Sequence, residues 1–309
     1  MSSKPRDLTG PPPGGPDPRL EQAILAALDR LLRALDLEPL GGDRFRAPSE
    51  QGRFADRVFG GQVVAQALVA ASRTVTGKEP HSLHAYFVET GTPEHSLDLT
   101  VERVRDGRSI STRRVTVAQG DRQLLIAMAS FHAGPAGPEL SEPAPPAPPP
   151  EELPVLQAWF LELPPETRER GPNWVEQPPP LELRIGEPPN FMGGPAARGP
   201  RAHWMRLPRD VGNDPLLHTA LLAYASDYLL MDVALRAHPE RLADGAFVGF
   251  SVDHALWFHR PVRFDRWHLY TQQAQCISGH RGLARGTIHD ADGHLVASAM
   301  QEVVVRRAR

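Results

Sequence analysis

Apolar and polar residues follow two different periods along this chain, and the same order of periods occurs twice. An apolar run with helical spacing at 59–75 precedes segments in which apolar residues recur at alternate positions, as in half-buried strands. A second helical run at 215–238 precedes another such set. One helix followed by several antiparallel strands, twice, predicts an α+β fold. The predicted strands are 81–88, 96–106, 109–119 and 123–133, then 246–259, 267–278, 281–290 and 294–307.

A nearly constant shift relates the two sets of elements. Ser130 and Gln301 are 171 residues apart, and Arg113 and Arg285 are 172 residues apart. The second helical run is apolar on nearly every face, which is typical of a helix buried on all sides. The pattern therefore predicts two related units, each a long buried helix wrapped by an antiparallel sheet.

Length and proline content divide the chain further. At a prior of about 150 residues per domain, 309 residues suggest two domains. Many of the 33 prolines lie in clusters at 10–18 and 135–155, where the composition favours extended chain, although compositional bias explains them equally well. We expect a disordered tail, an N-terminal unit, a proline-rich linker that is ordered in part, and a C-terminal unit. The expected bounds are 1–18, 19–134, 135–195 and 196–309.

Charge and hydropathy exclude several classes of partner. A net charge of −3 indicates neither a nucleic-acid nor an anionic-membrane partner. No window approaches the ~18 consecutive apolar residues of a membrane span, and the first residues lack the apolar run of a signal peptide. A single cysteine, Cys276, excludes an intramolecular disulfide and is expected to be packed in a strand. We expect a cytoplasmic protein.

Three polar residues interrupt apolar segments of the second half. Asp227 lies in the 215–238 run, Ser251 lies in the 246–259 segment, and Gln301 shares a strand face with apolar residues. Burying a carboxylate, a hydroxyl and an amide costs free energy unless they satisfy one another or a ligand. Such groups together can hold and activate a water molecule, which suggests a hydrolase without a covalent intermediate.

Each of these residues also has a structural interpretation. Asp227 could cap a helix restart, Ser251 could be an ordinary strand serine, and Gln301 could bond to backbone at a sheet edge. Ser251 is not in a nucleophile elbow, because the G-x-S-x-G motif needs a glycine where Asp253 stands. Asp253 and His254 are not expected to form a dyad, because adjacent strand residues point to opposite faces.

Several segments resemble, in order, those of the bacterial acyl-CoA thioesterase II family. They are FRAPSEQGRFADRVFGGQVVAQALVAA, HSLHAYFVETG and RDGRSISTRRV in the first half, and LLAYASDYLLMDVAL, VDHALWFHRP and LVASAMQE in the second. The resemblance covers roughly residues 37–134 and 196–307, and it implies two fused hotdog units whose sheets meet edge to edge. It implies catalytic roles for Asp227 and Gln301. Ser251 stands where the family usually has threonine, and it keeps the hydroxyl.

The resemblance also implies an activity, namely hydrolysis of fatty acyl-CoA to free fatty acid and coenzyme A. We expect direct attack by a water molecule whose proton Asp227 accepts, while Gln301 and Ser251 orient the water and donate hydrogen bonds. We expect no cofactor, no metal and a homo-oligomer. Two alternatives remain. A hotdog enoyl-CoA hydratase needs an aspartate–histidine pair, which AYASDYLLMD lacks, and a non-catalytic acyl-CoA binder has no reason to keep three polar residues in apolar segments.

Two further groups are candidates for substrate contacts. Gly60 and Gly61 open the first helix, whose free N–H groups and partial positive charge suit an oxyanion. Close packing of the helix start on the sheet explains them equally well. Four arginines are candidates for coenzyme A phosphates, although a solvated strand face is the more common outcome. They are Arg113, Arg114, Arg281 and Arg285. The histidines show no metal-ligand spacing.

Overall fold

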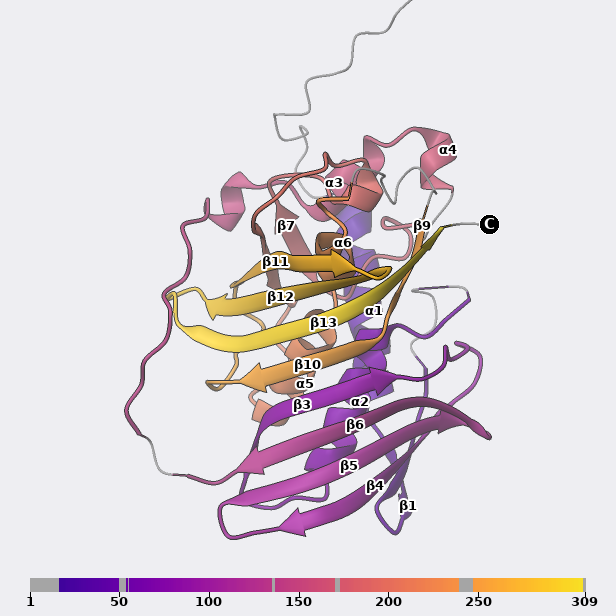
Figure 1. The fold of residues 1–309 in the computed structure, drawn as a ribbon, viewed down its shortest axis with the longest axis vertical. Helices are drawn as coiled ribbons and strands as arrows, with labels where there is room; N and C mark the ends of the chain where they lie inside the picture. Colours follow the sequence, from indigo (N-terminus) through magenta and orange to yellow (C-terminus); the bar gives the residue numbers. More distant parts are fainter. Residues whose placement is uncertain are drawn as a thin grey trace, which may run out of the picture.

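One antiparallel sheet runs through the whole molecule (Figure 1). The computed structural model describes residues 17–49, 54, 56–134, 137–169, 173–238 and 247–307. Within these residues, thirteen strands join in the order β1-β2-β4-β5-β6-β3-β10-β13-β12-β11-β8-β7, and β9 pairs with β13 beside this path. The strands are β1 (Glu38–Gly41), β2 (Arg44–Ala47), β3 (Glu79–Phe87), β4 (Leu97–Asp106), β5 (Ile110–Gln119), β6 (Arg122–His132), β7 (Glu182–Ile185), β8 (Arg201–Arg206), β9 (Phe247–Ser251), β10 (Asp253–Phe258), β11 (His268–Ser278), β12 (Arg281–Asp290) and β13 (Leu295–Arg307).

The strand order is symmetric about the central pair, β3 and β10. Outward from β3 follow β6, β5 and β4, and outward from β10 follow β13, β12 and β11. β2-β1 and β8-β7 then form the two ends. β3 and β10 pair antiparallel from Asp253 opposite Tyr86 to Trp257 opposite Ser82. Two half-sheets therefore meet edge to edge, as in a double hotdog.

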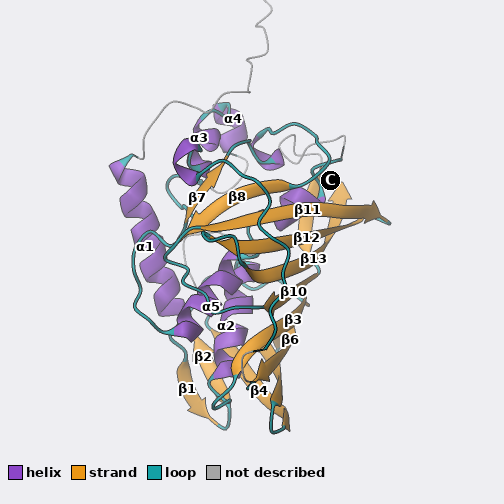
Figure 2. Ribbon diagram, turned by 90° about the vertical axis from the view of Figure 1, so that its left-hand side faces the viewer, coloured by secondary structure: helices purple, strands orange, loops and turns teal. Residues whose placement is uncertain are grey.

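The helices lie against one side of this curved sheet (Figure 2). α2 (Gly60–Ser72) and α5 (Pro215–Ala225) pack against each other and bury residues on nearly every face. Val64 and Leu68 of α2 are fully buried, and burial of each such side chain contributes about 1.5–3 kcal/mol. In the first half α2 packs on β2 to β6, and in the second half the short α6 (Leu230–Ala234) packs on β9, β11, β12 and β13 while α5 packs on α2.

The second predicted helix is interrupted. The apolar run predicts one helix over 215–238, but α5 ends at Ala225 and α6 (Leu230–Ala234) begins after a turn. Leu229 has a φ of 65°, in the left-handed region that a right-handed helix does not continue through. Apolar periodicity misses the break because both pieces are buried on all sides. The helix restarts at Leu230, but Asp227 does not cap it, because the N-cap of α6 is Leu229 and makes no side-chain hydrogen bond.

The predicted strand at 246–259 is also divided. Val252 separates β9 from β10 and donates its N–H to the carbonyl of Glu302 at 2.8 Å. β9 pairs with β13, whereas β10 lies between β13 and β3 of the other half. The other predicted strands begin and end within two residues of their expected bounds.

The sequence shift matches Ser130 to Gln301 and Arg113 to Arg285. In both pairs the residue at the equivalent place in the structure lies one position away. Gln301 lies opposite Ala284 on the buried face of β13 and β12, and the buried pair in the first half is Ala129 opposite Arg113. Ser130, which the shift matches to Gln301, is half-buried and lies on the other face. A shift of one residue reverses the face of every strand side chain, so Ala129 is the structural counterpart of Gln301.

One helix at the start of the first unit was not predicted. α1 (Pro18–Leu35) begins at Asp17, whose side chain accepts a hydrogen bond from the Arg19 N–H at 2.9 Å. Its buried residues have helical spacing, which is the signal that predicts such a helix. Residues 1–16 of the predicted tail lie outside the described residues. None of the helices in the described ranges is long and apolar enough to cross a membrane.

The predicted linker contains short ordered elements. They are η1 (Pro150–Glu152), α3 (Leu156–Leu161), α4 (Pro165–Arg168), β7 and η2 (Asn190–Met192). Trp159 of α3 is buried and donates its indole N–H to the carbonyl of Ile185 at 3.0 Å. This contact ties the segment to β7, the last strand on its side of the sheet.

Candidate active site

The structure brings together the side chains of Asp227, Gln301 and Ser251. Gln301 donates from Nε2 to Asp227 Oδ1 at 2.6 Å and to Ser251 Oγ at 2.8 Å. Gln301 is fully buried, and the other two residues are half-buried. A carboxylate, an amide and a hydroxyl therefore form one hydrogen-bonded cluster, with its carboxylate and hydroxyl partly open to solvent.

Three separate elements supply this cluster. Asp227 lies in the turn between α5 and α6, Ser251 ends β9, and Gln301 lies in the middle of β13. The helix break brings the Asp227 carboxylate to β13. The division at Val252 places Ser251 beside the same strand, opposite Val303. Both interruptions that sequence periodicity missed thus contribute to the cluster.

The start of α2 contacts the same carboxylate. The N–H of Gly61 donates to Asp227 Oδ2 at 2.8 Å, across 166 residues of sequence. α2 has no acidic residue in its first turn, and Phe59 at its N-cap offers no side-chain hydrogen bond. Asp227 therefore caps this helix from the opposite half of the chain. The partial positive charge at a helix N-terminus stabilises such an anion by about 0.3–1 kcal/mol, and by more when the site is partly buried.

Both glycines allow the close approach. A Cβ on Gly61 would overlap the backbone carbonyl oxygen of Tyr224, and a Cβ on Gly60 would lie 2.8 Å from Asp227 Oδ2. The Gly61 N–H is already bonded to Asp227. The Gly60 N–H makes no hydrogen bond within the described part of the chain, so Gly60 is the better candidate for an oxyanion contact.

Asp253 and His254 contact different partners. Asp253 Oδ1 accepts the N–H of Glu302 at 2.7 Å, and His254 Nε2 lies 2.8 Å from Ser226 Oγ. His254 is fully buried, and this burial lowers its pKa. The two residues do not cooperate as a dyad, because their side chains serve opposite faces of β10.

Arg113 is a structural residue and is not accessible to a coenzyme A phosphate. Its side chain is 1% exposed. All five N–H donors are used, on both the hydroxyl and the carbonyl of Thr74, the carbonyls of Arg105 and Thr112, and Asp106 Oδ1. Thr74 follows the C-terminal end of α2, where a cation complements the helix dipole. The two ends of α2 are thus matched by Asp227 and Arg113.

The other three candidate arginines lie away from the cluster. Arg114, Arg281 and Arg285 are exposed on strands whose neighbouring residues face the core. Arg281 pairs with Glu302 at 3.0 Å, Arg285 donates to Gln273 at 2.9 Å, and Arg114 lies 3.6 Å from a carboxylate oxygen of Glu102. Strand alternation places them on the outer face of the sheet, opposite to Gln301. The structure does not bring any of the four arginines to Asp227.

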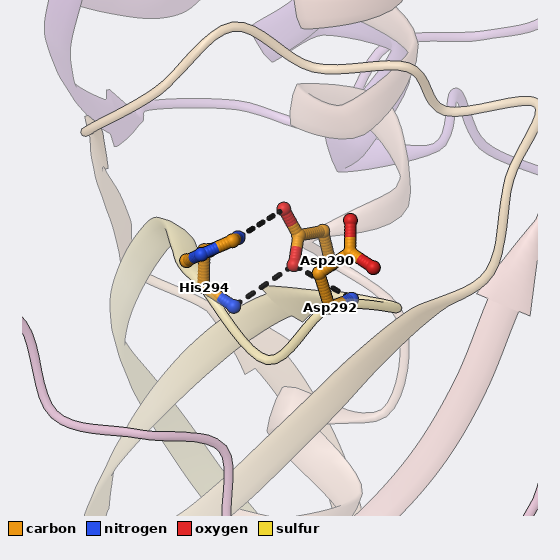
Figure 3. A group of neighbouring side chains, drawn as sticks. All are labelled: Asp290, Asp292 and His294. Carbon is orange, nitrogen blue, oxygen red and sulfur yellow. Dashed lines mark hydrogen bonds and ion pairs between the residues drawn. The ribbon is translucent and has the colours of Figure 1, made fainter.

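One cluster of the described residues has the composition of a metal site. Asp290, Asp292 and His294 lie on the turn between β12 and β13, with possible ligand atoms within 4.8 Å of one another (Figure 3). Asp290 Oδ1 accepts the N–H groups of Asp292 at 3.0 Å and His294 at 2.8 Å. These bonds are those of a tight turn closed by an aspartate side chain, and they account for the cluster.

Cys276 differs from its expected placement. It is exposed, whereas the sequence predicts a packed side chain. The pairing of β11 with β12 shifts between Ala274 and Cys276, and the residues beyond the shift are mostly solvent-exposed. Tyr270 and Gln272, earlier on the same strand, were not among the candidates, yet both contact the turn that carries Asp227. The signal that could have found them is two polar groups at alternate positions of a strand that faces a buried helix.

Fold and cluster together define a double-hotdog protein with a carboxylate–amide–hydroxyl site at the junction of its halves. A model described as the acyl-CoA thioesterase N-terminal domain matches residues 47–132, and one for the C-terminal domain matches 142–305. Acyl-coenzyme A thioesterase 8 of Mus musculus is 35% identical over 281 residues, covering 88% of this chain and 87% of its own. Acyl-CoA thioesterase 2 of Haemophilus influenzae is 32% identical over 284 residues, covering 90% and 98%.

Solved structures agree with these matches. The tesB protein of Mycobacterium avium subs paratuberculosis superposes with a TM-score of 0.74 at 31% identity, covering 91% of this chain and 99% of its own. The acyl-CoA thioesterase II TesB2 of Mycobacterium marinum superposes with a TM-score of 0.72 at 33% identity, covering 91% and 98%. The chain belongs to the acyl-CoA thioesterase II family, and its enzyme class is thioester hydrolase. Neither the hydratase nor the non-catalytic binder is favoured by these relatives.

Proposed function

We propose that this protein hydrolyses the thioester bond of fatty acyl-CoA by direct water attack, with Asp227 as the general base. The relatives are named as acyl-CoA thioesterases, which supports acyl-CoA as the substrate. The observation that carries the proposed mechanism is the hydrogen-bonded contact of Asp227 with Gln301 and, through it, with Ser251. These are the groups that can bind a water molecule and remove its proton.

The Asp227 carboxylate has capacity left for a water molecule. Each oxygen accepts one protein hydrogen bond, from Gln301 on Oδ1 and from Gly61 on Oδ2, and each keeps a lone pair for a further donor. Gln301 Oε1 is buried and accepts no hydrogen bond within the described chain. Ser251 Oγ accepts from Gln301, so its own hydrogen is available for donation. Water bound among these atoms would direct one proton to the carboxylate.

The proposed reaction then needs no covalent enzyme intermediate. The water oxygen bonds to the thioester carbonyl carbon as Asp227 takes its proton, and the carbonyl oxygen becomes an oxyanion. The positive end of α2, with the Gly60 N–H, would stabilise that oxyanion. When the carbon–sulfur bond breaks, the proton held by Asp227 passes to the sulfur. The products are the fatty acid and the free thiol of coenzyme A.

Substitution of Asp227 by asparagine tests the assignment. Asp227→Asn keeps the shape but removes the base, so kcat should fall by about 10²–10⁴. The measurement is thiol release from acyl-CoAs of short to long chain, together with the melting temperature. Asp292→Asn makes the same chemical change on the exposed β12–β13 turn and should retain wild-type kcat. Wild-type turnover by a folded Asp227→Asn protein would exclude Asp227 as the base.

We also propose an oligomeric state, a metabolic role, a cellular location and a division into domains. The family resemblance supports a homo-oligomer and a role in fatty acid metabolism, and the composition supports a cytoplasmic location. We propose the four-part division at 1–18, 19–134, 135–195 and 196–309, except that Asp17 and Pro18 belong to α1, with the base in the C-terminal unit. Sedimentation equilibrium of the full chain tests the oligomer, and a monomer mass across micromolar concentrations would contradict it.

A further inference from the structure

The turn that carries Asp227 is bonded on both flanks by side chains of β11. Tyr270 donates its hydroxyl to the carbonyl of Ser226 at 2.8 Å, and Gln272 donates from Nε2 to the carbonyl of Tyr228 at 2.7 Å. Both side chains are fully buried, and they share a face because they are two residues apart on a strand. Helix ends leave carbonyl groups without intrahelical partners. β11 supplies donors for the carbonyls immediately before and after Asp227.

A third buried side chain contacts the same turn from β10. Ser226 Oγ lies 2.7 Å from the carbonyl of Ala223 and 2.8 Å from His254 Nε2. The serine hydroxyl has one hydrogen, which it donates to the carbonyl, so it accepts from His254. His254 is therefore protonated on Nε2. Ser226 is held through its carbonyl by Tyr270 and through its hydroxyl by His254.

We propose that Tyr270, Gln272 and His254 are positioning residues for Asp227. They fix the backbone from Ser226 to Tyr228, so that the carboxylate points toward Gln301 and the start of α2. The proposal rests on the proposed role of Asp227 as the base. These side chains act through the turn, and none of them is assigned a contact with the substrate.

The chain leaves the path of α5 within this turn, where the Ser226 N–H still bonds to the Leu222 carbonyl at 2.9 Å. Tyr228 N–H bonds back to Ala225 at 3.1 Å, and Leu229 then adopts its left-handed conformation. α6 is only five residues long, so its position depends on packing against β9, β11, β12 and β13 and not on its own hydrogen bonds alone. A displacement of about 1 Å in a reacting group can lower turnover by up to about 100-fold. Loss of a donor from β11 would permit such a displacement of Asp227.

Removal of single donors gives the first test. Tyr270→Phe deletes one hydroxyl, and Gln272→Met replaces the amide with an apolar chain of similar length. Each should lower kcat by about tenfold or more, while KM for acyl-CoA stays within about twofold. Gln66→Met is the matched control. Gln66 is also a fully buried glutamine that donates to backbone carbonyls, of Ala34 at 2.8 Å and Pro48 at 3.0 Å, but it lies in the first half. It should lower the melting temperature and leave kcat unchanged.

A pair of His254 variants gives a test that does not depend on the β11 variants folding. His254→Gln keeps an N–H donor within reach of Ser226, whereas His254→Met does not. We expect His254→Gln to retain several times the kcat of His254→Met at similar melting temperature. Equal kcat values for the two variants would overturn the role of His254.

A double variant separates positioning from general destabilisation. If Tyr270 acts through Asp227, Tyr270→Phe should lower kcat in the wild-type background and have no further effect in Asp227→Asn. Wild-type kcat for folded Tyr270→Phe and Gln272→Met would overturn the positioning proposal while Asp227→Asn remained inactive. Full activity of Asp227→Asn would instead refute the proposed base. The two failures therefore give different results in the same series.

Discussion

The two halves of the molecule have the same arrangement of strands around a buried helix, but their helices differ. α2 runs without a break from Gly60 to Ser72 and carries no carboxylate. α5 stops at Ala225, and the turn that follows presents Asp227. The first half therefore offers a helix N-terminus, and the second half offers the anion that caps it. The comparison shows that one interruption in a repeated fold is enough to give the two halves complementary roles.

The strands show the same division. Gln301 lies on the inner face of the second half, and its structural counterpart in the first half is Ala129, which offers no hydrogen-bonding side chain. The neighbouring Ser130 bonds to His81 Nε2 at 2.8 Å on the opposite face. The first half thus lacks the amide as well as the carboxylate. We expect a single site in each chain, at the junction where α2 meets the end of α5.

Gly61 should be the most sensitive position of the first half. Gly61→Ala places a Cβ against the Tyr224 carbonyl, and because the obstacle is backbone, α2 and α5 must separate. We expect a loss of about 1–3 kcal/mol in unfolding free energy and a fall of about 100-fold or more in kcat. Urea unfolding and thiol release measure the two effects. Gly186→Ala, whose Cβ would lie 3.3 Å from a Leu153 methyl group, is the control and should be near neutral. Unchanged kcat in Gly61→Ala would show that the helix contact does not matter for turnover.

Gln301 and Ser130 allow a direct comparison of the halves. Gln301→Ala should cut kcat by about tenfold or more with little change in KM, because Gln301 is proposed to act on water and not on the acyl chain. Ser130→Ala should leave both constants unchanged. Steady-state kinetics of the two variants gives the result. A raised KM with unchanged kcat in Gln301→Ala would show that Gln301 binds the substrate and does not act on the water.

Stoichiometry tests whether the first half has a site of its own. Titration of the full chain with a non-hydrolysable acyl-CoA analogue should saturate at about one equivalent per chain, because one half alone has Asp227 and Gln301. Isothermal titration calorimetry gives this number directly. Two equivalent sites per chain would contradict the asymmetry.

Acid should lower the stability of the protein through a buried histidine of the second half. The fully buried histidines of the described residues include His203, whose pKa is lowered to about 3 by burial and then by the Arg201 charge. In the unfolded chain its pKa is about 6.5, so between these values the unfolded state binds a proton that the folded state does not. Stability should therefore fall as the pH falls, by about 2 kcal/mol from pH 7 to pH 5 for this group.

His203→Phe removes that titration while keeping an aromatic ring against Tyr270, 5.3 Å away between centroids. The free energy of unfolding in urea at pH 7 and pH 5 should then change less with pH than in the wild-type chain. His84→Phe, at an exposed histidine of the first half, is the control for the substitution itself. Equal slopes for His203→Phe and wild type would show that His203 titrates normally in the folded protein.

Much of this protein follows from residue order alone. Alternation and helical spacing locate α2, the start of α5 and the strands nearest the centre of the sheet to within a few residues, because each element has to bury one or more faces of its own. They do not find β1, β2, β7 and β8, the short strands at the two ends. The same reasoning singles out Asp227, Ser251 and Gln301, because a polar group in an apolar pattern is a local signal. It also singles out Gly60 and Gly61, since glycine at the start of a helical apolar run is a local signal too.

Long-range contacts determine the features of the protein that no local sequence pattern predicts. The Gly61–Asp227 bond joins residues 166 positions apart, and no periodicity within either segment contains it. The sequence predicts Arg113 as a surface cation, but two of its five hydrogen bonds, both to Thr74, form only when β5 meets the end of α2. The faces of Gln301 and Ser130 differ by a single residue of register, which pairing with β12 and β5 determines. The break after Ala225 likewise depends on donors from β11, because a carbonyl can leave a helix when another strand supplies its hydrogen bond.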